Sequence, residues 1–472
     1  MADHFLEDLF HPKSIAVVGA SGNPQSLNYA FVDHLVTYGF QGNIYPVNPR
    51  YEEIQGLNAY PDIRAIPGPV DYVISCVPSK QVLDLLDGCA EKGVKMVHLF
   101  TARFSETGRQ DAIDLELEIL KKATAAHIRL IGPNCMGLYY PEEGISFAYD
   151  LPKDSGPVGL ISQSGGGAAI FVSIAAMLGV RFSKVISYGN GLDLTESDYL
   201  EYFAADPETK VIAMYIEGVK DGQRFYNVLR KVAKEKPVII TKGGRGKSGV
   251  RTVSSHTASL AGSYKTWEAA VLQCGAIPAM SYEEMADLAA TFCFAPPIKG
   301  PRVGMSGGGG GPSVLAADEV DAAGFDLVPL PEEIREKIKT KAPVIWDWVD
   351  NPIDVSILGG LGVTNIDILE MMAADKNYDF LIVNMTEVPL RGNNGTSPEM
   401  GGYITLRETF KKPVLMVLNE KSLGKEDFDH WRWRQTGEMR SQLMKAHIPF
   451  YPTVKRAVRA AKKYMNYCSR NA

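Results

Sequence analysis

Short apolar runs alternate with helical patterns along most of the chain. Up to about residue 140, four apolar runs predict strands, and they read SIAVVGA, GNIYPVN, DYVISCV and KMVHLFT. The stretches between them have the spacing of helices, as in AFVDHLVTYG and VLDLLDGCAEKG. Strands that alternate with helices in this way predict a parallel sheet with helices on both faces, which is an α/β fold.

Two later segments of the chain follow one common plan. Their openings, PVGLISQSGGGAAIF and RVGMSGGGGGPSVL, each predict an apolar strand, a turn rich in serine and glycine, and a helix. Each opening is followed by Asn-x-x-Asp, by a helix that contains two alanines and an aspartate, and by a buried strand. We interpret the two segments as a duplicated α/β domain. The prolines and the glycine of CFAPPIKGPR predict a linker between them.

Length and composition narrow the class of protein. At about 150 residues per domain, a chain of 472 residues predicts three domains. The net charge of −6 is mild and argues against a nucleic-acid-binding protein, which normally presents a basic face.

No apolar run reaches the roughly 18–20 residues of a membrane span, and the start MADHFLEDLF lacks a signal-peptide core. We therefore expect a cytoplasmic protein. The six cysteines form no CxxC pair and indicate no metal site.

The first glycine-rich turn follows the first predicted strand, in IAVVGASGNPQSLNYAF. Its Gly19 and Gly22 would let backbone amides approach a pyrophosphate at a helix N-terminus, although a purely structural turn is the alternative. The next strand ends in Asn48, Pro49 and Arg50, where an NAD site would have an acidic residue for the ribose. The arginine favours a ligand with an additional phosphate on its ribose, which leaves NADP or coenzyme A.

A second glycine-rich turn, in ISQSGGGAAI, again lies between a strand and a helix. There the amides of Gln163, Ser164, Gly165 and Gly166 would be exposed at a helix N-terminus, which carries about half a positive charge. This turn suits a phosphoryl group. A turn that serves only close packing is the alternative.

The stretch SSHTASLAGS surrounds His256 with small residues, and the preceding KGGRGKSGVRTV is rich in glycine and cations. We expect an exposed loop that can approach another surface, in which the imidazole acts as a nucleophile. A surface histidine in a flexible loop is the alternative. Glu217 ends the apolar strand of IAMYIEGV, at the strand end where ligands gather in α/β sheets. Its carboxylate could accept an N–H of His256, although a lone carboxylate at a strand end is not specific.

In combination these stretches resemble the NDP-forming acyl-CoA synthetases, and in particular the α subunit of the ADP-forming acetyl-CoA synthetase type. The α subunit of succinyl-CoA synthetase is a more distant relative. The resemblance covers nearly the whole chain. It rests on IAVVGASGNPQSL, IYPVNPRYEEIQGLNAYPDI, GPNCMG, LISQSGG, ESDYLEYFAADPETKVIAMYIEG and SSHTASLAGS.

The resemblance implies a Rossmann-like CoA-binding domain over residues 1–140. Two flavodoxin-like, doubly wound parallel-sheet domains would follow over residues 141–296, with the phosphohistidine loop, and over residues 297–472. The residues expected to bind CoA are Gly19, Ser21, Gly22, Ser26, Leu27, Asn28, Asn48, Arg50, Val77, Pro78, Ser79, Phe100, Thr101, Ala102 and Asn134.

The resemblance also implies a reversible ligase reaction. A small carboxylic acid, CoA and ATP would give acyl-CoA, ADP and phosphate through an acyl phosphate and a phosphorylated His256. Glu217 would steady the imidazole, and the amides of Gln163 to Gly166 would hold its phosphoryl group. In the family, the histidine loop moves between the acyl site and a separate nucleotide site.

Two departures from the family pattern modify this expectation. No ATP-grasp domain follows the third unit, so we expect an ATP-grasp β subunit that holds ATP or ADP and Mg²⁺, in an assembly of two α and two β chains, or an α dimer when the chain is alone. The chain has Cys-Met-Gly at 135–137 and Ser-Gly-Gly at 164–166, where relatives often have Cys-Leu-Gly and Ser-Gly-Ala. Ala169 replaces the tyrosine of the succinate enzyme, which predicts an acyl group other than succinyl, with room for one bulkier than acetyl.

Two other classes of protein remain as alternatives. A CoA-binding sensor would keep the fold without the chemistry, but it would have no need for both His256 and Glu217. An NADP oxidoreductase would need a hydride-transfer site, for which the sequence shows no obvious catalytic pair.

Overall fold

The structure is a computed structural model of the whole chain. It describes residues 4–257, 263–358, 362–385, 398–418 and 431–470. The chain forms two compact units, which are described separately: Met1–Ala176 with Arg181–Met285, and Met177–Val180 with Ala286–Ala472.

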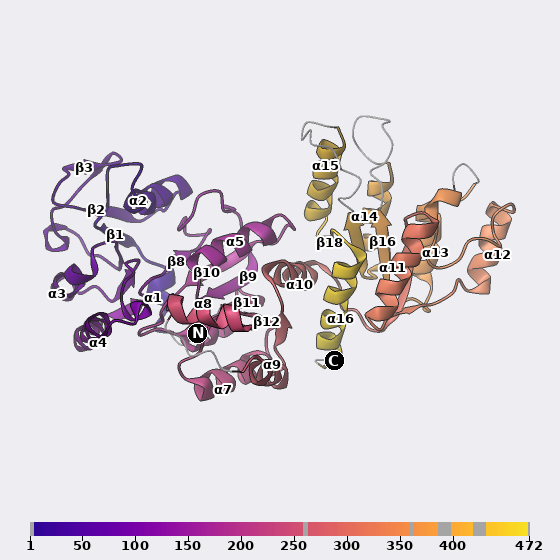
Figure 1. The fold of residues 1–472 in the computed structure, drawn as a ribbon. Coiled ribbons are helices and arrows are strands. Elements are labelled where there is room, and N and C mark those ends of the chain that lie inside the picture. The colour runs from indigo at the N-terminus through magenta and orange to yellow at the C-terminus, as the bar shows by residue number, and fades with distance from the viewer. Residues whose placement is uncertain (1–3, 258–262, 359–361, 386–397, 419–430, 471–472) are drawn as a thin grey trace. The chain divides into compact units, whose positions relative to one another are not determined.

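The first unit begins with a five-stranded parallel sheet of order β2-β1-β5-β6-β7 (Figure 1). All four strands predicted from the apolar runs are present. The strands are β1 (Ser14–Val18), β2 (Asn43–Val47), β5 (Tyr72–Ser75), β6 (Met96–Leu99) and β7 (Arg129–Ile131). The helices of this part are α1 (Glu7–Phe10), α2 (Leu27–Tyr38), α3 (Val82–Glu91) and α4 (Gln110–Ala125), and a short hairpin joins β3 (Glu53–Ile54) to β4 (Leu57–Asn58).

A second sheet completes the first unit, with the order β13-β12-β11-β9-β10-β8. Its strands are parallel except β8, which pairs antiparallel with β10. The strands are β8 (Gly137–Tyr139), β9 (Ser155–Ser162), β10 (Phe182–Ser187), β11 (Val211–Ile216), β12 (Val238–Lys242) and β13 (Ile277–Ala279). The helices are α5 (Gly165–Ala176), α6 (Glu196–Ala205), α7 (Gly222–Val232), α8 (Lys247–Thr257), α9 (Tyr264–Gln273) and α10 (Tyr282–Phe294). Because β8 pairs with β10, the second sheet begins a few residues before the domain boundary at residue 140 that the sequence predicts.

The second unit contains a five-stranded parallel sheet of order β15-β14-β16-β17-β18. The strands are β14 (Arg302–Ser306), β15 (Asp326–Leu327), β16 (Phe380–Met385), β17 (Val414–Leu418) and β18 (Phe450–Tyr451). The helices are α11 (Gly310–Ala322), α12 (Glu332–Lys341), α13 (Asn365–Ala374), α14 (Pro398–Phe410), α15 (Trp431–Lys445) and α16 (Val454–Arg470). None of the helices in the described ranges is long and apolar enough to span a membrane.

The second and third sheets repeat one topology, which supports the predicted duplication. The order β13-β12-β11-β9-β10 has its counterpart in β18-β17-β16-β14-β15. Helices α6 and α13 both begin with a Thr-x-x-Asp capping box, in which the two side chains satisfy backbone amides of the first turn. At the other end of each helix a lysine closes the turn: Nζ of Lys236 donates to the carbonyl oxygen of Asp206, and Nζ of Lys412 donates to that of Asp375, each at 2.6 Å.

Candidate functional site

The carboxyl ends of β1, β5, β6 and β7 bring the predicted CoA-binding residues to one edge of the first sheet. The segment from Gly19 to Asn28 connects β1 to α2, and three further segments follow β5, β6 and β7. Hydrogen bonds join these segments: Oγ1 of Thr101 donates to the Val77 carbonyl, and the Asn134 amide donates to the Thr101 carbonyl at 3.0 Å. The residues placed in these three segments are Val77, Pro78, Ser79, Phe100, Thr101, Ala102 and Asn134.

Two asparagines brace the first glycine-rich turn. Nδ2 of Asn28 donates to the carbonyl oxygens of Gly19, at 3.0 Å, and Cys76, at 3.3 Å. Nδ2 of Asn48 donates to the Ala20 carbonyl at 2.7 Å. Their amide groups therefore shape the turn. The side chain of Arg50 is exposed beside them and can reach a ligand on this edge.

The second glycine-rich turn connects β9 to α5. The amides of Gln163 and Ser164 already have acceptors, because they donate to the Tyr215 carbonyl at 3.0 Å and to Oγ of Ser162 at 3.2 Å. The amides of Gly165 and Gly166 belong to the first turn of the helix, where no intrahelical acceptor exists, so they are the ones that suit an anion. A Cβ on Gly165 would lie only 2.3 Å from Cγ of Met136, which requires glycine there.

Glu217 follows β11 directly and is held at three points. Its amide donates to Oε1 of Gln163 at 2.6 Å, and its carbonyl oxygen accepts from Nζ of Lys242. Its Oε1 accepts from the hydroxyl of Tyr215 at 3.1 Å. The residue is only 8% exposed, yet Oε2 has no hydrogen-bond partner among the described residues. One oxygen of a buried, fixed carboxylate is therefore left for a further donor.

The charges around Glu217 fit this arrangement. Burial, and then the negative charge of Glu217, raises the pKa of Tyr215 well above its ordinary value and that of Tyr282 to about 12. Both phenols therefore keep their protons near neutral pH and can donate. Burial lowers the pKa of Lys242, although the charge of Glu217 acts in the opposite direction.

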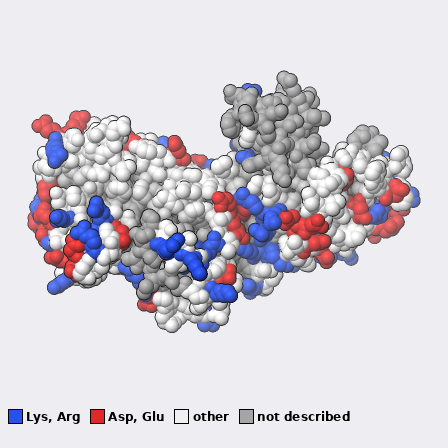
Figure 2. Space-filling view, viewed as in Figure 1, with Lys and Arg blue, Asp and Glu red and all other residues white. Residues whose placement is uncertain are grey.

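His256 lies in the last turn of α8, the helix that follows β12. The sequence predicts an exposed loop over residues 242–263, and this is wrong for residues 247–257, which form α8. Gly249 is the one helix-breaking residue in that stretch. The side chain of His256 and residues 258–262 lie outside the described part of the chain. Helix α8 packs beside Ser105–Thr107, a short 3-10 helix that follows β6 in the first sheet. Figure 2 shows lysine and arginine side chains gathered over α8, where Lys247 and Arg251 are exposed.

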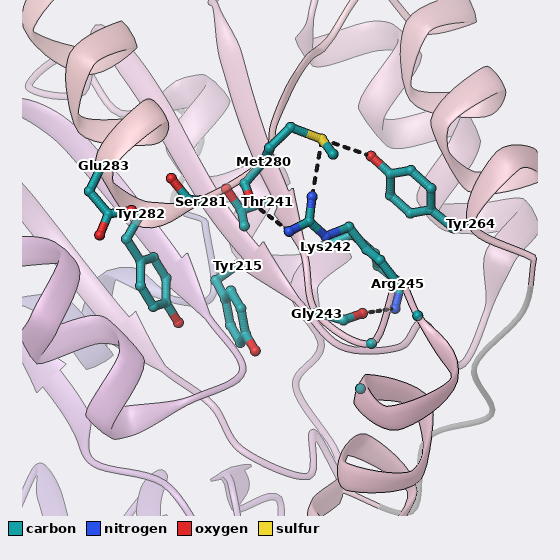
Figure 3. Close-up of a pocket in the computed structure, with 13 residues that line it drawn as sticks. Tyr215, Thr241, Lys242, Gly243, Arg245, Tyr264, Met280, Ser281, Tyr282 and Glu283 are labelled. Carbon is teal, nitrogen blue, oxygen red and sulfur yellow. Dashed lines mark hydrogen bonds between the residues drawn. The ribbon is translucent and has the colours of Figure 1, made fainter. Parts of the chain in front are cut away.

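A cavity of about 700 Å³ opens beside Glu217, at the carboxyl ends of β11, β12 and β13. Figure 3 shows Tyr215 and Tyr282 side by side in its wall, with both hydroxyls at the same end. Across the cavity, Arg245 donates to the Met280 carbonyl at 2.6 Å. Sequence reasoning missed both tyrosines. Tyr215 could have been found, because it lies two residues before Glu217 and so on the same side of the strand, whereas nothing in the sequence connects Tyr282 with this site.

The two parts of the first unit meet next to these groups. Backbone amides of the second sheet's loops reach the first part, since the Asn190 amide donates to the Pro133 carbonyl at 3.0 Å. Nδ2 of Asn190 donates to Oε2 of Glu106 at 2.8 Å, and the Met136 amide donates to Oγ of Ser187 at 3.1 Å. These contacts join the edge of the first sheet, where ligand binding is predicted, to the part of the unit that carries the turn before α5.

Comparison with known proteins agrees with the class of protein that the sequence predicts. Residues 13–141 match the family described as CoA binding domain, and residues 155–292 match the family described as succinyl-CoA ligase like flavodoxin domain. The chain is 40% identical over 415 residues to the α subunit of acetate–CoA ligase (ADP-forming) II of Pyrococcus furiosus, covering 87% of this chain and 89% of the relative. The α subunit of ligase I from the same organism is 32% identical, with 96% of each chain covered.

A solved structure gives the same result for the fold. The dinucleotide-forming acetyl-coenzyme A synthetase 1 of Candidatus Korarchaeum cryptofilum, in complex with phosphate and ADP, matches with a TM-score of 0.81 at 32% identity, covering 99% of this chain and 98% of that chain. The chain belongs to the NDP-forming acyl-CoA synthetase family, as an α-subunit chain of its ADP-forming acid–thiol ligases. The predicted family and fold class are thereby confirmed.

Proposed function

We propose that this chain forms acyl-CoA from a small carboxylic acid by way of a phosphorylated His256. The observation that carries the proposal is the buried carboxylate of Glu217, which is fixed on three sides and has Oε2 left for a donor. An imidazole N–H at Oε2 would fix the tautomer, so that the other ring nitrogen carries the phosphoryl group. The first-turn amides of Gly165 and Gly166 supply positive charge for that group.

The reaction then proceeds in three balanced steps. The imidazole nitrogen of His256 attacks the γ-phosphorus of ATP, and ADP leaves. An oxygen of the carboxylic acid attacks the same phosphorus, the P–N bond breaks, and an acyl phosphate forms. The CoA thiolate attacks the acyl carbon, and inorganic phosphate leaves. Each covalent intermediate divides a difficult transfer into easier ones.

The nucleotide belongs on a partner in this proposal. The chain spans 49% of the acetate–CoA ligase (ADP-forming) of Methanocaldococcus jannaschii, whereas it covers most of two relatives that are named α subunits. We infer that an ATP-grasp β subunit supplies the site for ATP or ADP and Mg²⁺, in an assembly of two α and two β chains in the cytoplasm.

Arg50 supports CoA as the ligand of the first sheet. Replacing Arg50 by alanine is expected to weaken CoA binding about tenfold, because a charge-assisted contact to the ribose phosphate is lost. Isothermal titration calorimetry measures this affinity. The matched control is Arg109→Ala, which removes an exposed arginine that pairs with Asp111. Tight NADP binding without CoA binding would contradict the assignment.

The side chain at position 169 bears on the acyl group. Ala169 lies in the first half of α5, and its side chain is much smaller than the tyrosine expected of a succinate enzyme. Relatives include a 4-hydroxybutyrate–CoA ligase (ADP-forming) of Nitrosopumilus maritimus, 33% identical over 354 residues, and a trans-feruloyl-CoA synthase, 28% identical over 482 residues. We propose an acyl group other than succinyl, either acetyl or a bulkier aliphatic or aryl group.

A panel of acids tests the acyl group together with the reaction. With an ATP-grasp partner present, the expected result is release of ADP and formation of acyl-CoA with acetate or with bulkier aliphatic or aryl monocarboxylic acids, at a higher kcat/KM than with succinate. Activity confined to succinate would contradict the proposal.

A further inference from the structure

Two tyrosines in the cavity wall are linked to Glu217: Tyr215 bonds its carboxylate, and Tyr282 packs against Tyr215. The hydroxyl of Tyr215 donates to Oε1 of Glu217 at 3.1 Å. The ring of Tyr282 packs against that of Tyr215, with the ring centroids 5.3 Å apart and the planes tilted by 45°. The hydroxyl of Tyr215 has one proton, and Glu217 accepts it.

We propose that Tyr215 and Tyr282 are positioning residues that orient the Glu217 carboxylate toward the imidazole of His256. This inference rests on the proposed function. The backbone of Glu217 is fixed by Gln163 and Lys242, so rotation of the side chain is the freedom that remains. The bond from Tyr215 removes that freedom and directs Oε2, the oxygen without a described partner, to the incoming donor.

The hydroxyl of Tyr282 also lies next to the phosphate turn. A Cβ on Gly167 would lie 2.1 Å from the hydroxyl of Tyr282, so this hydroxyl sits directly over the first turn of α5. The two tyrosines come from different elements, β11 and the start of α10.

The test removes single hydroxyl groups while keeping the rings. In the complex with its ATP-grasp partner, Tyr215→Phe is expected to lower kcat about tenfold, with KM for CoA and for the acid changed less than about twofold. Tyr282→Phe is expected to lower kcat by about threefold, a smaller loss, because Tyr282 contacts Tyr215 and does not itself bond Glu217. The matched control is Tyr202→Phe, because the Tyr202 hydroxyl also bonds a carboxylate, that of Glu7 at 3.2 Å, and this variant should keep the wild-type kcat.

A double-mutant cycle separates positioning from packing. If Tyr215 acts through the carboxylate, Tyr215→Phe should cause no further loss in a Glu217→Gln background. Wild-type kcat in Tyr215→Phe, or an additive loss in the double variant, would overturn this inference and leave the proposed function intact. A wild-type chain that is never phosphorylated with its partner would overturn the proposed function and this inference with it.

Discussion

Replacing His256 by alanine is expected to abolish acyl-CoA formation, with a loss of at least about 10⁴-fold in kcat. The imidazole is the only group in the proposal that accepts the phosphoryl group from ATP and passes it to the acid, so no step can bypass it. Formation of acyl-CoA and release of ADP, measured with the partner subunit present, report the loss. Because the change removes a side chain near the end of α8, CoA affinity should stay within about twofold of the wild-type value.

The control for this variant is His11→Ala. The ring of His11 is 43% exposed and contacts Glu7 and Glu143 on the surface of the first unit. Its removal should leave the rate unchanged, since exposed pairs of this kind contribute little to stability. A rate in His256→Ala within a factor of ten of the wild type would contradict a phosphohistidine mechanism.

Glu217→Gln is expected to slow phosphorylation of the chain by about 10- to 1,000-fold while the fold is kept. The amide has nearly the shape of the carboxylate, and the backbone bonds to Gln163 and Lys242 do not depend on the side-chain charge. What is lost is the negative charge that stabilises an imidazolium during transfer. Single-turnover mixing with ATP and the partner subunit measures the rate.

Glu283→Gln is the matched control for this second prediction. Glu283 is an exposed carboxylate that lines the same cavity. Its removal tests whether any loss of charge near the cavity slows the reaction, and it should leave phosphorylation within about twofold of the wild type. If Glu217→Gln phosphorylates as fast as the wild type, Glu217 has no part in the mechanism.

The sequence predicted the elements that depend on local patterns. Apolar runs bounded by glycine or proline became β1, β2, β5 and β6, and the repeated plan of two segments became two sheets of one topology. Glu217 was recognised because an apolar strand ended immediately before it. Periodicity and turn chemistry carry this information, since both act over a few residues.

The contacts that complete the site depend on pairings far apart in the chain. Gln163 meets Glu217 because β9 and β11 are neighbours in the sheet, and Tyr282 reaches Tyr215 only because α10 returns to the same edge. The sequence assigned Gln163 to phosphate through its amide, whereas its side chain accepts from two backbone amides. Such contacts depend on the order of the strands in the sheet, and the hydrophobic periodicity of a single segment does not reveal that order.

The most direct test of the central claim follows the phosphoryl group itself. The chain is mixed with γ-³²P-labelled ATP, alone and with the ATP-grasp partner. The account predicts acid-labile label on this chain only when the partner is present, and none in His256→Ala. Label that persists in His256→Ala, or a wild-type chain that stays unlabelled while acyl-CoA forms, would contradict it.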